Sequence, residues 1–253
     1  MQSNTRRNSN GGSSPVKEMK TGSNLPSLVF PNEMADNPDI IFAVGDIHGC
    51  DAALKSMLHF LLPLKQRCVF LGDYIDRGPS SIRVIEQLVS AKISRPDWVF
   101  LLGNHELMLR DNLRLKIPTI GENTGYEQYM AIGGIPAAHQ AFFEGLLPYF
   151  ESDQFLFVHG GVGSNPHLPI DQYATEELVW TEDVHPDWNG KTIVRGHRVV
   201  ELPEQLTGSI NLDTGCYKRR WLSAGILCDR TGQLLVAYQT SFDGDSSRTV
   251  RFD

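Results

Sequence analysis

Five short segments of the chain place glycine beside residues that bind metal ions or phosphate. In chain order they read GDIHG at 45–49, GDYIDRG at 72–78, GNHE at 103–106, HGG at 159–161 and RGH at 195–197. Each follows an apolar run that predicts a buried strand. Ligands of open α/β sheets bind beyond the carboxyl ends of the strands, and glycine lets the backbone approach an ion or phosphate closely. The five segments therefore predict one shared site at the ends of several strands.

The side chains in these segments indicate two divalent metal ions. Asp, His and Asn without Cys favour manganese, iron or zinc. Asp46 and His48 lie two residues apart, so both can face the same side of an extended segment. Asp73 has two carboxylate oxygens and can bridge two ions. Six ligands exceed what one tetrahedral zinc needs. The predicted ligands are Asp46, His48, Asp73, Asn104, His159 and His197.

Two metal ions about 3.5–4 Å apart suit in-line displacement at phosphorus, because they activate a water and hold the phosphoryl oxygens. The nucleophile is then a metal-bridging hydroxide, and no covalent phosphoenzyme is needed. Arg77 and Arg195 can bind phosphate bidentately. His105, next to Asn104, can protonate the leaving alkoxide while Asp76 orients its imidazole. The residues thus predict a metal-dependent phosphoester hydrolase.

Each segment taken alone has a structural explanation. A Gly-Asp or Gly-His pair after a strand is usually a turn, and an arginine beside a glycine usually faces solvent. The joint occurrence of five segments in the same context favours a metal site. The remaining histidines lie outside this pattern and are expected in the core or at the surface: His59, His139, His167 and His185.

Apolar runs and helical spacing predict the elements that carry the segments. The alternation of strands and helices predicts an α/β fold. Residues 104–148 look mainly helical, with breaks near Pro118 and Gly133-Gly134, and the chain after Lys191 looks rich in strands. Strands are expected at 40–44, 68–71, 98–102 and 155–158, and helices at 51–62, at 79–89 and near Glu176.

Composition predicts a disordered N-terminal tail at residues 1–38, followed by a single folded domain at 39–253. Residues 1–38 are rich in Ser, Asn, Gly and Pro and show no periodicity. The formal net charge of −7 argues against nucleic acid or an anionic membrane as a partner. No signal peptide, membrane span or C-x-x-C pair is visible, so we expect a cytoplasmic monomer with four reduced cysteines.

The five motifs, in this order and spacing, resemble the PPP-type serine/threonine phosphoprotein phosphatases of the calcineurin-like metallophosphoesterase superfamily. They cover residues 45–197. The resemblance implies a central β-sandwich flanked by helices, with two metals at one edge and usually manganese in the test tube. It implies that a first metal is bound by Asp46, His48 and Asp73, and a second by Asp73, Asn104, His159 and His197. It also implies that His105 and Asp76 form the acid pair. The phosphate would be held by Arg77 and Arg195.

The end of the chain resembles the compact bacterial-type members, on the residues Asn211-Leu212-Asp213-Thr214-Gly215. Those members often carry an arginine just after a tryptophan, whereas Thr181 follows Trp180 here. They also often have Gly-His-Thr at the last ligand, where this chain has Arg195-Gly196-His197-Arg198. Arg198 is therefore a further candidate for the phosphate, with a solvent-facing role as its alternative.

Three functions are compatible with these features. The first is hydrolysis of phosphoserine and phosphothreonine in proteins, with phosphotyrosine as a further substrate. The second is hydrolysis of dinucleoside polyphosphates such as diadenosine tetraphosphate, with an adenine stacked in a helical cap at 107–147. The third, a binding module without catalysis, is disfavoured because every inferred ligand is present. The cap's aromatic residues would be stacking platforms or core: Tyr126, Tyr129, Phe142, Phe143 and Tyr149. The metals are expected to be manganese, with iron, zinc, nickel or cobalt as alternatives.

Overall fold

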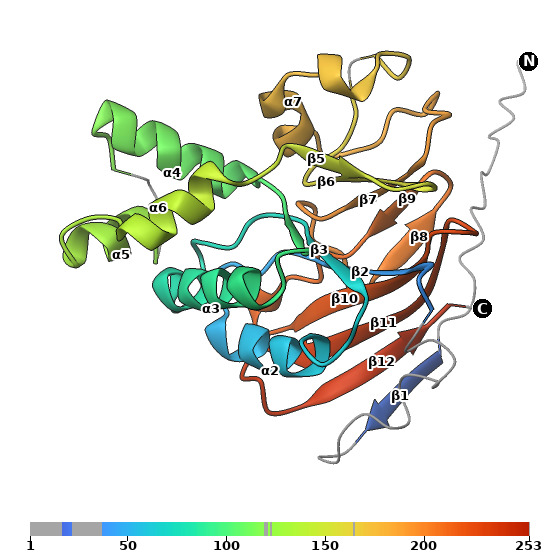
Figure 1. Cartoon of the computed structure of the whole chain (residues 1–253), viewed down its shortest axis with the longest axis horizontal. Coiled ribbons are helices and arrows are strands. Elements are labelled where there is room, and N and C mark those ends of the chain that lie inside the picture. Colours follow the sequence, from blue (N-terminus) through green and yellow to red (C-terminus); the bar gives the residue numbers. More distant parts are fainter. Residues whose placement is uncertain (1–16, 22–36, 119–120, 122, 164, 253) are drawn as a thin grey trace, which may run out of the picture.

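Two mixed β-sheets pack face to face in the computed structural model (Figure 1), which describes residues 17–21, 37–118, 121, 123–163 and 165–252. The seven-stranded sheet has the order β1-β12-β11-β10-β2-β3-β4, and the five-stranded sheet has the order β5-β6-β7-β9-β8. In the first sheet, β2, β3 and β4 run parallel. In the second, β6, β7 and β9 run parallel. This is the predicted sandwich fold.

The strands of the first sheet are β1 Lys17–Thr21, β2 Ile40–Val44, β3 Arg67–Phe70, β4 Val99–Phe100, β10 Trp221–Cys228, β11 Gln233–Ser241 and β12 Ser247–Arg251. Those of the second are β5 Tyr149–Glu151, β6 Phe155–Val158, β7 Thr192–Arg195, β8 Glu204–Leu206 and β9 Ser209–Asn211. The helices are α2 Asp51–Leu61, α3 Ser81–Ser94, α4 Asn104–Leu115, α5 Gly125–Ala131, α6 Ala137–Glu144 and α7 Thr175–Trp180, with single turns η1 Ile170–Gln172 and η2 Cys216–Lys218.

Alternation along the central strands divides the core into layers. In β2, Ile40 and Phe42 face the helices α2 and α3, whereas Ile41 and Ala43 face the second sheet. Successive side chains of a strand point to opposite faces, so a strand buried on both sides reads as a continuous apolar run. Phe157 of β6 packs into the layer between the sheets. The resulting order is helices, sheet, sheet and the helix α7 (Figure 1).

Most predicted elements are confirmed, but two boundaries differ. The helix expected from Pro79 begins at Ser81, because the hydroxyl of Ser80 accepts from the Arg83 N–H and caps it. It runs on to Ser94, five residues beyond the prediction. The third strand is only two residues long, because it is the edge of its sheet and the chain then pairs Leu101 with Leu147.

The predicted tail, residues 1–38, contains one strand that the prediction of disorder missed. β1 pairs antiparallel with β12, with Met19 opposite Thr249. Without β1, β12 would expose a row of unpaired backbone groups, and such an edge pairs with a strand of almost any composition. Residues 1–16 and 22–36 of the predicted tail lie outside the described residues.

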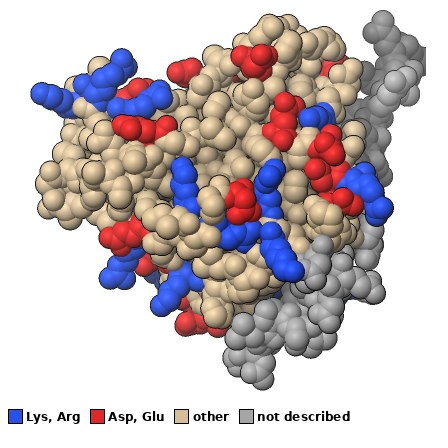
Figure 2. All heavy atoms as spheres, viewed as in Figure 1, with Lys and Arg blue, Asp and Glu red and all other residues tan. Residues whose placement is uncertain are grey.

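Two further expectations bear on the rest of the molecule. All four cysteines are buried and unpaired, as predicted. Among the described residues, no helix combines the length and the apolar composition needed to cross a membrane. Acidic and basic side chains are interspersed on the face drawn in Figure 2.

Candidate metal centre

The predicted site residues converge where the carboxyl ends of parallel strands from both sheets meet. The loop after β2 brings His48, the loop after β3 brings Asp73, and the start of α4 brings Asn104. From the second sheet, β6 leads to His159 and β7 leads to His197. This placement confirms that the five motifs come together at one site.

Five residues of the site adopt a backbone conformation that side chains other than glycine rarely take. The φ angles are 46° at His48, 52° at Asp73, 68° at Asp76, 66° at Arg77 and 67° at His197. Left-handed residues of this kind cost free energy and cluster where function requires a particular side-chain direction. Here the strain turns three of the predicted ligands inward.

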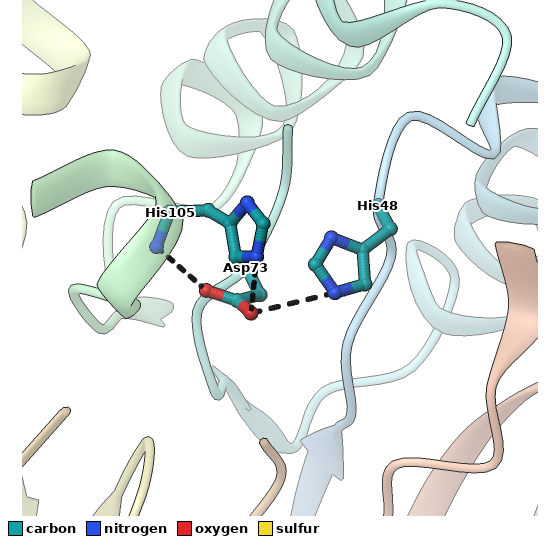
Figure 3. Close-up of side chains that lie close together, drawn as sticks. All are labelled: His48, Asp73 and His105. Atoms are coloured by element: carbon teal, nitrogen blue, oxygen red, sulfur yellow. Dashed lines mark hydrogen bonds and ion pairs between the residues drawn. The ribbon is translucent and has the colours of Figure 1, made fainter. Parts of the chain in front are cut away.

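Asp73 occupies the middle of the site. One carboxylate oxygen, Oδ2, lies 3.4 Å from His48 Nε2 and 3.9 Å from His105 Nε2. The other, Oδ1, lies 3.2 Å from His159 Nε2. Figure 3 shows His48 and His105 reaching the carboxylate from different segments. Asp73 thus belongs to both groups of side chains that could hold a metal ion, one with His48 and His105 and one with His159 and His197.

The side-chain amide of Asn104 joins this cluster. The end of the amide that faces the cluster lies 2.9 Å from His159 Nε2, 3.1 Å from His197 Nδ1 and 3.2 Å from both carboxylate oxygens of Asp73, and its NH2 group can donate to these atoms. Turned the other way, the amide oxygen could instead face a bound metal ion. The donor set of carboxylate, amide and imidazole suits borderline and hard divalent ions.

The imidazoles are held in the tautomer that a metal ligand needs. The Nδ1–H of His48 donates to the carbonyl of Ile75 at 2.9 Å, and that of His159 donates to the carbonyl of Leu71 at 2.9 Å. In both rings Nε2 therefore faces Asp73. Metal-binding histidines are commonly oriented by such bonds to backbone carbonyls.

Burial and charge set the protonation of these groups. Burial lowers the pKa of His48 to about 3 and that of His197 to about 4. Burial also opposes the charge of His159, but Asp73 outweighs it and raises the His159 pKa to about 10. The pKa of Asp73 is lowered, because the histidines around it offset its burial. The ionised carboxylate of Asp73 thus faces a protonated His159, whereas His48 and His197 are neutral.

Asp46 lies beside the cluster, not within it. Its carboxylate accepts from the backbone N–H of His197 at 3.0 and 3.2 Å. A Cβ on Gly196 would lie 1.9 Å from Asp46 Oδ1, so only glycine fits there. Burial, followed by the charge of Asp213, raises the pKa of Asp46 well above its usual range. Metal binding by Asp46 stays a prediction.

His105 and Asp76 lie together as the sequence predicted. His105 Nδ1 lies 2.5 Å from Asp76 Oδ2. Asp76 is held by two further bonds, because Oδ1 accepts from the N–H of Gly125 at 2.5 Å and its own N–H donates to Ser81 Oγ at 3.0 Å. Burial lowers the pKa of His105, but Asp73 and Asp76 outweigh it and raise the pKa overall. The pair therefore favours a protonated imidazole beside the metal cluster.

Arg77 faces the site from its exposed side. Its NH2 group lies 3.1 Å from His105 Nε2, and its NH1 group donates to the hydroxyl of Tyr217 at 2.7 Å. The Tyr217 ring packs edge-on against His48, with 5.0 Å between ring centroids. The guanidinium is thus exposed and next to both halves of the predicted machinery.

Arg195 is held by the loops around it, and its role in phosphate binding stays a prediction. It is only 5% exposed, and its guanidinium donates to the carbonyls of Gly160 and Glu182. It also lies 3.9 Å from the Asp183 carboxylate. Arg195 is the last residue of β7, where its side chain supplies hydrogen bonds to the loops that follow β6 and α7. Arg198 is exposed and pairs with Asp183 at 2.5 Å, so it too is engaged away from the cluster.

Two residues near the centre escaped the sequence analysis. Glu106 accepts from the N–H groups of Asp73, Tyr74, Ile75 and Gly103 at 2.8 to 3.2 Å, and so fixes the β3 loop to the start of α4. The sequence feature that could have pointed to Glu106 is its position in the GNHE motif. Tyr217 had none, because its contact with His48 joins segments far apart in the chain.

Comparisons with known proteins agree with this geometry. A family model described as calcineurin-like phosphoesterase matches residues 40–221. The asymmetrical bis(5'-nucleosyl)-tetraphosphatase of Geobacillus sp. (strain WCH70) is 26% identical over 213 residues, covering 68% of this chain and 84% of that protein. Serine/threonine-protein phosphatase 2 of Salmonella typhimurium is 24% identical over 198 residues, covering 70% and 88%.

A protein serine/threonine phosphatase structure from Saccharomyces cerevisiae matches with a TM-score of 0.59 and 19% identity, covering 78% of this chain and 74% of that one. Its likeness supports the fold. Members of the matched family use a binuclear centre of divalent ions, and the His and Asp side chains cluster here accordingly. Because the family model spans most of the chain and all five motifs, this protein belongs to the calcineurin-like phosphoesterases.

Proposed function

We propose that the chain is a metal-dependent phosphoprotein phosphatase that hydrolyses phosphoserine and phosphothreonine, with phosphotyrosine as a further substrate. The observation that carries this proposal is the His105–Asp76 pair at 2.5 Å, beside a carboxylate shared by two candidate metal groups. A serine or threonine alkoxide is a poor leaving group unless it is protonated as the P–O bond breaks. A nucleotide phosphate leaves without such help, so the acid pair favours monoesters of alcohols.

Two divalent ions would be held by the six predicted ligands, with Asp73 between them, and we propose manganese as the working ion. When bound, such ions supply positive charge for the phosphoryl oxygens and lower the pKa of the attacking water. The two groups of potential ligand side chains that share Asp73 support this assignment. Iron, zinc, nickel and cobalt are the alternatives, since the same donors accept them.

The chain's own residues would position the ester and move the proton. Arg77, exposed and 3.1 Å from His105, would bind phosphoryl oxygens through its guanidinium. His105 would give its Nε2 proton to the ester oxygen as the bond to phosphorus breaks, and the alcohol would leave. Asp76 would stabilise the imidazolium before the transfer. With Arg195 bound to backbone carbonyls, Arg77 is the residue we assign to the phosphate.

Hydrolysis of dinucleoside polyphosphates is the second candidate, and one feature of the helical cap favours it. A cavity of about 660 Å³ lies between α4 and α6, lined in part by Leu109, Leu113 and Phe143. Such a cavity could take a base. Of the predicted stacking platforms, Tyr129 and Phe142 are buried in the core, whereas Phe143 lines this cavity.

A substrate comparison with added manganese tests the proposal. We would compare kcat/KM for phosphoserine, phosphothreonine and phosphotyrosine peptides, for diadenosine tetraphosphate and for p-nitrophenyl phosphate. Faster turnover of the peptides than of the dinucleotide is the expected result. His105→Ala should slow the phosphoserine peptide far more than p-nitrophenyl phosphate, whose leaving group needs no proton. The proposal would be contradicted if diadenosine tetraphosphate were the fastest substrate and if His105→Ala lost the same fraction of its activity on the phosphoserine peptide and on p-nitrophenyl phosphate.

A further inference from the structure

Three consecutive basic residues lie near the candidate metal centre, although they are far from most of its motifs in the sequence. They are Lys218, Arg219 and Arg220. We call them the basic turn. They lie at the end of η2, between β9 and β10, and all three are exposed. None of the three forms an ion pair with another described residue. By contrast, other exposed arginines do have such partners, as in the pairs Arg83–Asp51 and Arg198–Asp183.

Tyr217 connects the basic turn to the metal centre. The Nζ of Lys218 lies 5.5 Å from the centre of the Tyr217 ring, and the Cζ of Arg77 lies 4.9 Å from the same point. The ring also packs edge-on against His48. Arg77 and Lys218 therefore both lie against the Tyr217 ring, which places the basic turn next to the predicted phosphate ligand.

The backbone holds this turn in a defined conformation. The N–H of Lys218 donates to the carbonyl of Gly215 at 2.9 Å, and that of Arg220 donates to the carbonyl of Cys216 at 3.3 Å. Gly215 and Arg219 both have left-handed φ angles, 67° and 59°. Three adjacent cations in an ordered turn repel one another, and a chain of net charge −7 does not need them for solubility. A negatively charged ligand would remove the repulsion.

We propose that the basic turn recognises acidic side chains next to the phosphorylated residue of a peptide substrate. The inference rests on the proposed phosphoprotein phosphatase function and narrows its substrate class to acidic phosphorylated segments. Residues two apart in an extended peptide lie about 7 Å apart on the same side. An acidic side chain that flanks the phosphorylated residue could therefore reach Lys218 while Arg77 binds the phosphate, because both cations lie against the Tyr217 ring. Arg219 contributes less, because its guanidinium lies over the ring of Phe242, 5.7 Å from its centre.

Two phosphoserine peptides test the inference if they differ only at the flanking positions, with Asp and Glu in one and Asn and Gln in the other. The measured quantity is the ratio of their kcat/KM values, for the full-length chain and for the Lys218→Gln/Arg220→Gln double variant. We expect the ratio to favour the acidic peptide and to fall by about 3- to 10-fold in the double variant, the range of two exposed ion pairs. It should also fall as salt rises.

The matched control is Arg110→Gln/Arg114→Gln, which removes the same charge from two exposed residues of α4 and should leave the ratio unchanged. Equal turnover of both peptides by the unaltered chain would overturn the inference and leave the phosphatase function standing. An unchanged ratio in the double variant would also overturn it. Turnover of p-nitrophenyl phosphate and diadenosine tetraphosphate without either peptide would contradict the function itself, and the inference with it.

Discussion

At the scale of single residues, Asn104 and His105 are neighbours in the GNHE motif but have different proposed roles. Asn104 turns its side-chain amide to the cluster, whereas His105 turns its Nδ1 to Asp76, and we propose that His105 Nε2 serves the substrate. His105 Nε2 nevertheless lies 3.9 Å from Asp73 Oδ2, close enough for a metal ligand. The two roles make different predictions.

His105→Ala should reduce turnover of a phosphoserine peptide by about 10²- to 10⁴-fold, the usual contribution of general acid catalysis. Metal content measured by mass spectrometry should stay near that of the unaltered chain, because the six proposed ligands remain. His59→Ala, on an exposed position of α2, is the control. A parallel fall in metal content and activity would make His105 a ligand.

At the scale of elements, Glu106 couples the β3 loop to α4. Its two carboxylate oxygens accept four backbone N–H groups, and the side chain is 3% exposed. Burial raises the pKa of Glu106 to about 7, with Asp73 adding to the shift. The Glu106 carboxylate is therefore the hydrogen-bond acceptor for four N–H groups that would bond to water in the unfolded chain.

Glu106→Ala should lower the free energy of unfolding by about 3 kcal/mol or more, because each buried N–H left without a partner costs about 1–3 kcal/mol. Chemical denaturation of the metal-free chain measures this without interference from the ions. Glu144→Ala, on an exposed position of α6, should change stability little. If both variants unfolded at the same denaturant concentration, Glu106 would not couple the two elements.

The helical cap should give the fold a pH-sensitive contact between α5 and α6. His139 of α6 is buried, with its Nδ1 3.0 Å from the hydroxyl of Tyr129 in α5. Burial lowers the His139 pKa below its ordinary value of 6.5. The folded state therefore binds this proton less readily than the unfolded state, and stability present above pH 6.5 should be lost as the pH falls below it.

The comparison variant for this contact is His139→Gln, which cannot be protonated. The difference in unfolding free energy between pH 7.5 and pH 5.5 should be smaller in His139→Gln than in the unaltered chain, both measured without metal. An identical pH dependence would show that His139 does not contribute to it.

At the scale of the whole molecule, the site joins two sheets that otherwise meet through apolar packing. His48 and Asp73 come from the seven-stranded sheet, and His159 and His197 come from the five-stranded sheet. Ions bound among them would cross-link the halves of the sandwich. Ligands that bind only the folded state stabilise it in proportion to the logarithm of their concentration.

Removal of the ions should therefore lower the melting temperature. With free manganese at about 100 times its Kd, the stabilisation is about 2.7 kcal/mol. Thermal unfolding with manganese and with a chelator measures the difference, and the triple variant His159→Ala/His197→Ala/Asn104→Ala should show a smaller one. A melting temperature that does not respond to manganese would place any bound ions elsewhere.

The sequence predicted what depends on neighbouring residues and missed what depends on distant ones. The apolar run at Ile40–Val44 and the glycine-rich motif after it specify a strand and its polar end locally, and both are confirmed. The contact of Tyr217 with His48 and the pairing of β1 with β12 join segments far apart in the chain. Arg195 illustrates the same limit, because its neighbours in the motif did not reveal the carbonyls of Gly160 and Glu182 that it binds.

The central claim is that Asp73 bridges two metal ions, and metal stoichiometry tests it most directly. Manganese bound per chain would be measured by equilibrium dialysis for the unaltered protein and for Asp73→Ala, with Asp51→Ala as a control on an acidic residue of α2. The account predicts two ions in the unaltered protein and in Asp51→Ala, and loss of both in Asp73→Ala. One fully occupied site in Asp73→Ala, or a single ion in the unaltered protein, would contradict it.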